Sequence, residues 1–182
     1  MDICEKVFYE LGNYGPVFTL FFSLFLLRKK RVFFNYYLIG YFINLLLNLF
    51  LKLLVKQSRP SVDKKEFELA LKYAKNNDYL NSISYDVFGM PSGHAQTVLY
   101  SGSFIFFVMK NAVINMNISI FMFYACIILI TLIQRVQYKF HTINQVIVGG
   151  IIGVVFAYIV YYMAFRNKKG QLKEKEDDNG PL

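Results

Sequence analysis

Three short stretches of this sequence place cations and imidazoles beside the ends of long apolar runs. One of them has Arg135 six residues before His141, and Gln145 four residues after that histidine. Arginine binds phosphate oxygens bidentately, and a neutral imidazole can attack phosphorus. If the chain is helical from Thr142 onward, Gln145 lies one turn from His141 on the same face and can orient its ring. The alternative is an ordinary interfacial turn with a snorkelling arginine.

A second stretch closes an earlier apolar run, where Lys52 precedes Arg59 and Pro60. A lysine in the last turn of a membrane helix is costly unless it snorkels to the interface or meets an anion. The proline ends the helix, and Arg59 offers a second cation near the first. Snorkelling alone is the simpler explanation for Lys52.

The third stretch, Pro91-Ser92-Gly93-His94, opens another apolar run. Pro91 and Gly93 shape a turn, and the backbone N–H groups of Ser92 and Gly93 are exposed where a helix begins. Such a helix start attracts anions through its free N–H groups and its dipole. The alternative is a plain helix start with an incidental histidine.

The combination predicts more than each stretch alone. The chain contains two histidines, and both fall in these stretches together with three cations. Such a set suits a phosphate ester or diphosphate whose tail lies in lipid. The sequence offers no carboxylate cluster and no Cys/His spacing typical of a metal site, so we expect metal-independent chemistry without a cofactor.

The composition indicates a membrane protein. The 182 residues are 55% hydrophobic and 18% charged, whereas soluble domains are about 45–50% apolar with about a quarter of residues charged. We therefore predict an all-α, polytopic membrane helix bundle of about five transmembrane helices. The expected spans are Tyr14–Leu27, Phe33–Val55, Pro91 or His94 to Val113, Ile120–Ile133 and Ile143–Phe165.

Between the second and third spans, residues 56–90 form a polar region. Phe67, Ala70, Leu71 and Ala74 predict one amphipathic helix there, outside the membrane. Residues 1–165 are expected to form a single integral-membrane domain. The charged tail, residues 166–182, is expected to be disordered.

Charge predicts the orientation of the bundle. The net charge is +8, and the basic residues gather at the ends of apolar runs, which favours membrane topology and anionic lipid over nucleic acid. The block Arg28-Lys29-Lys30-Arg31 directly follows the first span. By the positive-inside rule that end is cytosolic, as is the tail, and the three stretches lie on the opposite face.

In order, the three stretches resemble the three motifs of the phosphatidic-acid-phosphatase type 2 superfamily. The resemblance covers roughly residues 52–153 and departs from the usual pattern twice: Gln134 stands where the superfamily usually has serine, and Gln145 where it usually has aspartate. Within the superfamily, Arg-Val-x-Tyr-x-x-His-Thr followed by Gln and a Gly-containing apolar helix is similar to the dolichyl diphosphatases. Those enzymes hydrolyse dolichyl diphosphate to dolichyl phosphate at the lumenal face of the endoplasmic reticulum, for reuse in N-glycosylation.

The resemblance implies that His141 is the nucleophile and forms a phosphohistidine, and that His94 is the acid toward the leaving group. Gln145 can accept a hydrogen bond from the His141 ring but cannot neutralise an imidazolium. Either it orients the ring through its carbonyl oxygen, which we favour, or the partner acid lies elsewhere, or the site is weakened. The resemblance assigns the phosphoryl oxygens to residues of all three motifs: Lys52, Arg59, Ser92, Gly93 and Arg135.

Two other functions stay open at this point. One is a different lipid phosphatase of the superfamily, acting on phosphatidate, a sphingoid phosphate or another prenyl diphosphate. The other is a catalytically weakened relative that binds anionic lipid, which Gln134 and Gln145 keep open. A small channel is a remote third, because it leaves both histidines unexplained. The expected partners are the lipid substrate and the bilayer.

Overall fold

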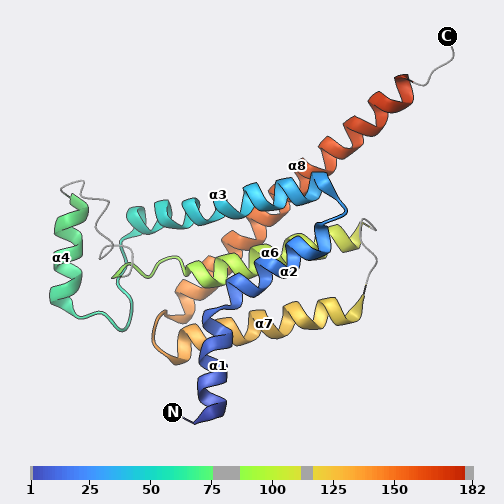
Figure 1. Ribbon diagram of the computed structural model, residues 1–182. Coiled ribbons are helices and arrows are strands. Elements are labelled where there is room, and N and C mark those ends of the chain that lie inside the picture. The colour runs from blue at the N-terminus through green and yellow to red at the C-terminus, as the bar shows by residue number, and fades with distance from the viewer. Residues whose placement is uncertain (1, 76–86, 112–116, 179–182) are drawn as a thin grey trace.

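The computed structural model describes residues 2–75, 87–111 and 117–178, and this part of the chain folds into helices without strands (Figure 1). The prediction of an all-α fold is confirmed. Within the described ranges the helices are α1 (Ile3–Asn13), α2 (Gly15–Leu27), α3 (Arg31–Val55), α4 (Lys64–Lys75), α6 (Gly93–Lys110), α7 (Ile118–Gln137) and α8 (Ile143–Asp178).

Three of these helices are long and apolar enough to cross a membrane: α3, α7 and the Ile143–Gly170 part of α8. Helices α1 and α2 pass the same test as a pair bent by 58°, which raises the number to four. The predicted five is therefore approximate. The difference is α6, which carries Gln96, Thr97 and Ser101 among its apolar residues and is not one of these candidates.

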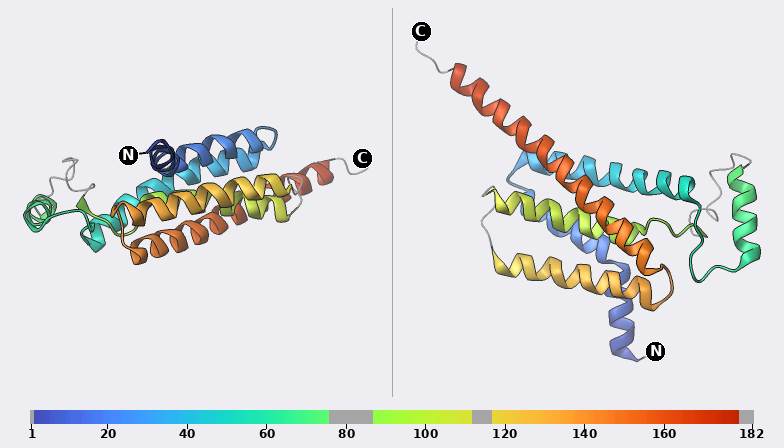
Figure 2. Two further views of the ribbon diagram at one scale, coloured as in Figure 1. Left: turned by 90° about the horizontal axis from the view of Figure 1, so that it is seen from below. Right: turned by 180° about the vertical axis from the view of Figure 1, so that it is seen from behind.

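Helix α6 is the centre of the bundle. It packs most extensively on α8 and also contacts α2, α3 and α7, and the views of Figures 1 and 2 agree that the other long helices surround it. Its aromatic residues Tyr100 and Phe104 join Tyr37 of α3 in the hydrophobic core. Aromatic pairs in this core lie 5.3–6.2 Å apart between ring centroids, the range in which edge and offset contacts are favourable.

Buried amides join α3 to α6. The Gln96 side chain donates to the backbone and side-chain oxygens of Asn44, at 3.0 and 2.8 Å. Asn48 donates to Gln96 Oε1 at 2.8 Å and to the Pro91 carbonyl at 3.3 Å. Buried polar groups are costly unless they are paired, so this network opposes any sliding of α6 along α3.

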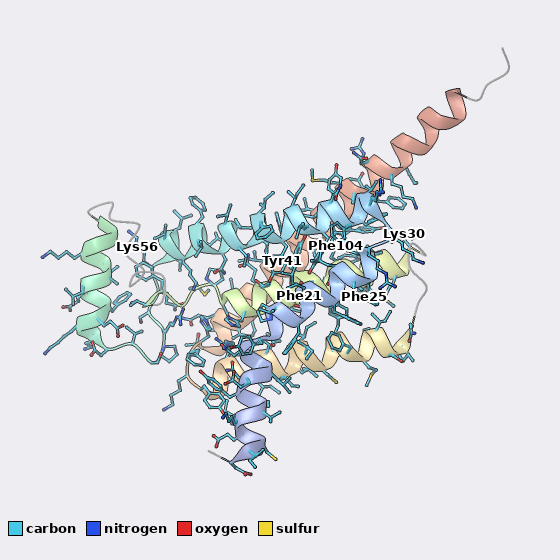
Figure 3. The ribbon with its side chains drawn as sticks, in the orientation of Figure 1. Phe21, Phe25, Lys30, Tyr41, Lys56 and Phe104 are labelled. Atoms are coloured by element: carbon cyan, nitrogen blue, oxygen red, sulfur yellow. The ribbon has the colours of Figure 1, made fainter. Side chains whose placement is uncertain are left out.

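The outer surfaces of the helices are apolar. Phe21 and Phe25 of α2 are 66% and 57% exposed, whereas Tyr41 and Phe104 lie in the interior (Figure 3). Leu46 and Leu54 continue the exposed apolar surface on α3. A water-soluble protein rarely exposes apolar surface of this extent, so the apolar helices indicate an integral membrane protein.

The polar connections divide between the two ends of the bundle. Figure 3 labels Lys30 at one end and Lys56 at the other. The end of α3, the start of α6, the end of α7 and the start of α8 lie together at the Lys56 end, where α1 and α4 also lie (Figure 1). The assignment of this end to the non-cytosolic side stays a prediction.

Helix α4 is the amphipathic helix predicted outside the spans. Ala70 is fully buried with Val87 and Phe88, and Phe67 and Leu71 pack against them; the side chain of Ala74 lies outside the described residues. Its start is capped because Asp63 accepts a hydrogen bond from the Glu66 N–H at 2.8 Å.

The C-terminal segment differs from the prediction. The fifth span was expected to end at Phe165 and to be followed by disorder, whereas the backbone of α8 continues to Asp178. The reason is local, since Lys, Glu, Gln and Leu dominate this segment and all favour helix. The domain boundary at residue 165 and the cytosolic position of the tail stay predictions. The connection between the predicted third and fourth spans, residues 114–119, lies partly outside the described residues, and α7 starts at Ile118.

Two glycines of α8 allow it to pack closely on α6. A Cβ atom at Gly149 would lie 2.5 Å from the carbonyl oxygen of Ser92, and one at Gly153 would collide with the carbonyl oxygen of Gln96. Both obstacles are backbone atoms, which cannot rotate away. These two glycines therefore permit backbone-to-backbone contact between α8 and α6.

We expect Gly153→Ala to push α8 away from α6 and to destabilise the protein by about 1–3 kcal/mol, the usual cost of overpacking. Gly170→Ala is the matched control, because nothing lies within 4 Å of a Cβ atom there. In the control the better helix propensity of alanine is the only effect. Thermal unfolding in detergent measures both, and equal midpoints for the two variants would contradict this packing.

Candidate active site

The structure brings the three motif stretches together at one end of the bundle. Lys52 lies in the last turn of α3 and is 7% exposed, and Arg135 lies in the last turn of α7 and is 5% exposed. Arg59, Lys52 and Arg135 all interact electrostatically with His141, and the same three cations interact with His94. Residues up to 89 positions apart thus share one electropositive site.

The end of α3 determines where Arg59 lies. Helix α3 ends at Val55 and is capped by Lys56, which adopts the left-handed conformation with φ 47° and ψ 41°. The chain then runs beside the segment that precedes α6: the Arg59 N–H donates to the Val87 carbonyl at 3.1 Å, and the Gly89 N–H donates to the Gln57 carbonyl at 2.7 Å. This short antiparallel contact joins the end of the first motif to the start of the second.

His141 lies in the connection between α7 and α8 and is 3% exposed. Its backbone N–H donates to the carbonyl of Arg135 at 3.0 Å. Its ring Nδ1 lies 3.2 Å from Oε1 of Gln145, one turn into α8. The arrangement expected from the spacing of His141 and Gln145 is therefore present.

Backbone groups fix the orientation of the Gln145 amide. Its Oε1 accepts from the Thr142 N–H at 3.2 Å, and its Nε2 donates to the Ser58 carbonyl at 3.0 Å. A backbone N–H can only donate and a carbonyl can only accept, so the amide cannot be flipped. The oxygen of Gln145 therefore faces His141, the proton of the neutral imidazole lies on Nδ1, and Nε2 keeps its lone pair.

The helix start at Ser92 differs in detail from the prediction. The Ser92 N–H donates to the Gln145 carbonyl at 3.0 Å, so this N–H, which the sequence assigned to an anion, is used inside the protein. Helix geometry leaves the N–H groups of Gly93, His94 and Ala95 without intrahelical acceptors, and no side chain caps them. The buried Ser92 hydroxyl also has no hydrogen-bond partner among the described residues. The Ala95 N–H belongs to this set of uncapped groups, although the sequence analysis did not name it.

His94 and Arg135 share a partner that the sequence analysis also missed. His94 Nε2 lies 3.1 Å from the Asn13 carbonyl, which can only accept, so this nitrogen carries the proton. Arg135 Nη2 donates to Asn13 Oδ1 at 3.0 Å, and Arg135 Nε donates to Gln134 Oε1 at 2.6 Å. Nothing in the sequence places Asn13 near these residues, because its position depends on how α1 packs.

The environment keeps His141 neutral. Burial, and then the positive charges of Arg59 and Lys52, lower the pKa of His141 from 6.5 to about 3. Near neutral pH the imidazole is therefore uncharged, and the lone pair on Nε2 is of the kind that can attack phosphorus. Among the residues that the structure describes, His, Cys, Asp and Glu form no group of three that could hold a metal ion. Metal-independent chemistry stays a prediction.

These features define a class: a helical membrane protein with a buried, neutral imidazole among three cations. A comparison with protein families agrees. The model of the PAP2 superfamily matches residues 33–169, and the chain belongs to this superfamily. Its members are phosphatases, and membership suggests a lipid phosphatase embedded in the membrane. No curated protein and no solved structure matches the chain.

We expect Gln145→Ala to lower kcat for phosphate release strongly, because the His141 ring loses the group that fixes its proton on Nδ1. The loss of tautomer control in a serine-protease triad, on the order of 10⁴-fold, is the upper bound. Asn144→Ala is the matched control, since Asn144 is the exposed neighbour in the same helical turn. Equal kcat values for the two variants would show that the amide has no part in orienting the ring.

The low pKa of His141 also predicts how stability depends on pH. Below pH 6.5 the unfolded chain binds a proton at residue 141 that the folded protein does not bind until about pH 3. This contribution to the free energy of unfolding is therefore complete above pH 6.5 and is lost as the pH falls, by at most about 1.4 kcal/mol per pH unit. We expect the unfolding midpoint of the wild type to fall more steeply between pH 7 and 4.5 than that of His141→Asn. If the unfolding midpoints of the two proteins fall equally with pH, the lowered pKa of His141 is contradicted.

Proposed function

We propose that the protein is a lipid diphosphatase that hydrolyses dolichyl diphosphate to dolichyl phosphate and inorganic phosphate. The proposed compartment is the endoplasmic reticulum, with the site on its lumenal face. The observation that carries the proposal is the Nδ1 contact of His141 with the Gln145 oxygen, at 3.2 Å. It leaves Nε2 as the free nucleophilic atom of a neutral ring beside three cations.

In the proposed reaction, the Nε2 lone pair attacks the terminal phosphorus while the bond to the bridging oxygen breaks. The products are a phosphohistidine at His141 and lipid phosphate. Water then attacks the phosphorus and the P–Nε2 bond breaks; inorganic phosphate leaves with the oxygen and both protons of that water, and Nε2 regains its lone pair, which restores the neutral imidazole. Throughout, the Nδ1 proton stays hydrogen-bonded to Gln145, so no carboxylate is needed to hold it.

Phosphate binding is proposed for all three motifs. Lys52, Arg59 and Arg135 would offset the charge of the transferring phosphoryl group, usually a large catalytic contribution. The free N–H groups at Gly93 and the next two residues, with the buried Ser92 hydroxyl, would contact its oxygens.

The substrate class follows from the leaving group. An amide cannot neutralise the positive charge that develops on His141, so this site suits a reaction that makes a modest demand on the nucleophile. A diphosphate meets that condition because lipid phosphate is a much weaker base than an alkoxide. His94, the proposed acid, then has little protonation to provide, and its Nε2–H can stay hydrogen-bonded to the Asn13 carbonyl.

The test is inorganic phosphate release by the purified protein in detergent, with a chelator present. The panel contains dolichyl diphosphate, undecaprenyl diphosphate, phosphatidate and a sphingoid phosphate. We expect dolichyl diphosphate to give the highest kcat/KM. Preference for phosphatidate would contradict the substrate and keep the phosphatase, whereas no turnover of any of them would favour a lipid-binding relative.

The two histidines should differ in the same assay. His141→Ala removes the nucleophile, so we expect phosphate release below detection and no trapped phosphohistidine after an alkaline quench. His94→Ala removes only acid catalysis, whose usual contribution is about 10²- to 10⁴-fold. With a diphosphate we expect a loss at or below the lower end of that range. Retained turnover in His141→Ala would refute its assignment as nucleophile.

A further inference from the structure

Helix α1 packs on the end of α7, directly beside the proposed phosphate site. Gly12 makes the close approach possible, because a Cβ atom there would lie 2.5 Å from Cβ of Gln134. The ring of Tyr9 packs edge-on against Tyr138, with 5.0 Å between centroids, in the connection that leads to His141. The superfamily match begins at residue 33, so α1 and α2 lie before the matched region.

The last residue of α1 bonds to both neighbouring motifs. Asn13 accepts from His94 Nε2 through its carbonyl at 3.1 Å, and from Arg135 Nη2 through Oδ1 at 3.0 Å. The guanidinium only donates, which fixes the Asn13 amide with its oxygen toward Arg135. One residue thus connects the histidine of the second motif to the arginine of the third.

Gln134 holds the other edge of the same guanidinium. Its Oε1 accepts from Arg135 Nε at 2.6 Å, and its Nε2 donates to the Tyr9 carbonyl at 3.4 Å, so α1 holds this amide too. The guanidinium carbon lies 4.7 Å from the centroid of the Phe140 ring. Both amides are neutral, so they orient the guanidinium without cancelling the charge that an anion would bind.

We propose that Asn13 is a positioning residue of the active site, which holds Arg135 and His94 at the place where the phosphoryl group binds. The N-terminal helix is then part of the catalytic unit and not only a membrane anchor. This inference rests on the proposed phosphatase function. In this proposal Asn13 and Gln134 orient the Arg135 side chain, which without them could extend toward the membrane interface.

Two variants separate orientation from charge. Asn13→Ala removes the acceptor of Arg135 Nη2 and leaves the guanidinium held only through Nε, while the residue 13 carbonyl still accepts from His94. We expect kcat/KM for dolichyl diphosphate to fall about 10- to 100-fold, as for loss of a hydrogen bond to a charged group. Asn13→Asp keeps the acceptor and the side-chain volume but neutralises Arg135. We expect it to raise KM more than Asn13→Ala does, with a smaller effect on kcat. Asn35→Ala, an exposed asparagine on α3, is the matched control.

A binding measurement keeps this test independent of turnover. We expect inorganic phosphate to raise the thermal midpoint of the wild type and of Asn35→Ala at matched ionic strength, as any ligand of the folded state does. The shift should be smaller in Asn13→Ala and smallest in Asn13→Asp. If all four proteins respond equally, or if Asn13→Ala and Asn13→Asp have the same KM, the positioning role is overturned while the phosphatase stands. If the wild type neither binds phosphate nor turns over substrate, both proposals fail.

Discussion

Gln145 takes part in hydrogen bonds with all three motif stretches, and the site depends on them. Its side chain bonds to the His141 ring, to the Thr142 N–H, and to Gln57 and Ser58, which lie between Lys52 and Arg59. Its backbone carbonyl accepts from the Ser92 N–H of the second stretch. All of these groups are buried or partly buried, where an unpaired polar atom is costly. The three segments are therefore held together by the hydrogen bonds of one residue. The bonds of its side chain also determine which nitrogen of His141, the proposed nucleophile, carries the proton.

The helix bundle prepares this arrangement by placing polar groups inside and apolar groups outside. Asn44, Asn48 and Gln96 bond to one another across α3 and α6, and Asn48 reaches the Pro91 carbonyl just before the α6 start. The glycines of α8, which also packs on α3, allow backbone contact with Ser92 and Gln96. The start of α6 is thus held by two helices, by hydrogen bonds to α3 and by close packing on α8. A rigid helix start is what an anion site made of backbone N–H groups requires.

Much of this could be predicted from the sequence, because it depends on local patterns. Apolar runs gave the helices, and residue types with fixed spacing indicated Lys52, Arg59, His94, Arg135 and His141. The one-turn relation of His141 to Gln145 follows from helical periodicity. What could not be predicted depends on tertiary packing. The bend between α1 and α2 brings Asn13 to Arg135. The Ser92 N–H donates to the Gln145 carbonyl, so it is not available to an anion. The helical backbone beyond Phe165 was missed because charge was given more weight than helix propensity.

The two departures from the usual superfamily pattern have a common physical effect. Gln145 stands where an aspartate is usual and Gln134 where a serine is usual, and both are fully buried amides. At His141 the amide fixes the ring without adding negative charge, and at Arg135 it fixes the guanidinium without adding negative charge. Because fields are weakly screened in a buried site, the carboxylate that is absent at position 145 leaves the potential more positive, whereas the change from serine to Gln134 leaves the charge as it was. Under the proposed mechanism this favours a substrate that carries several negative charges and leaves as a phosphate. The same change weakens support for an imidazolium, so under the proposed mechanism the site would turn over diphosphates better than monoesters with poor leaving groups.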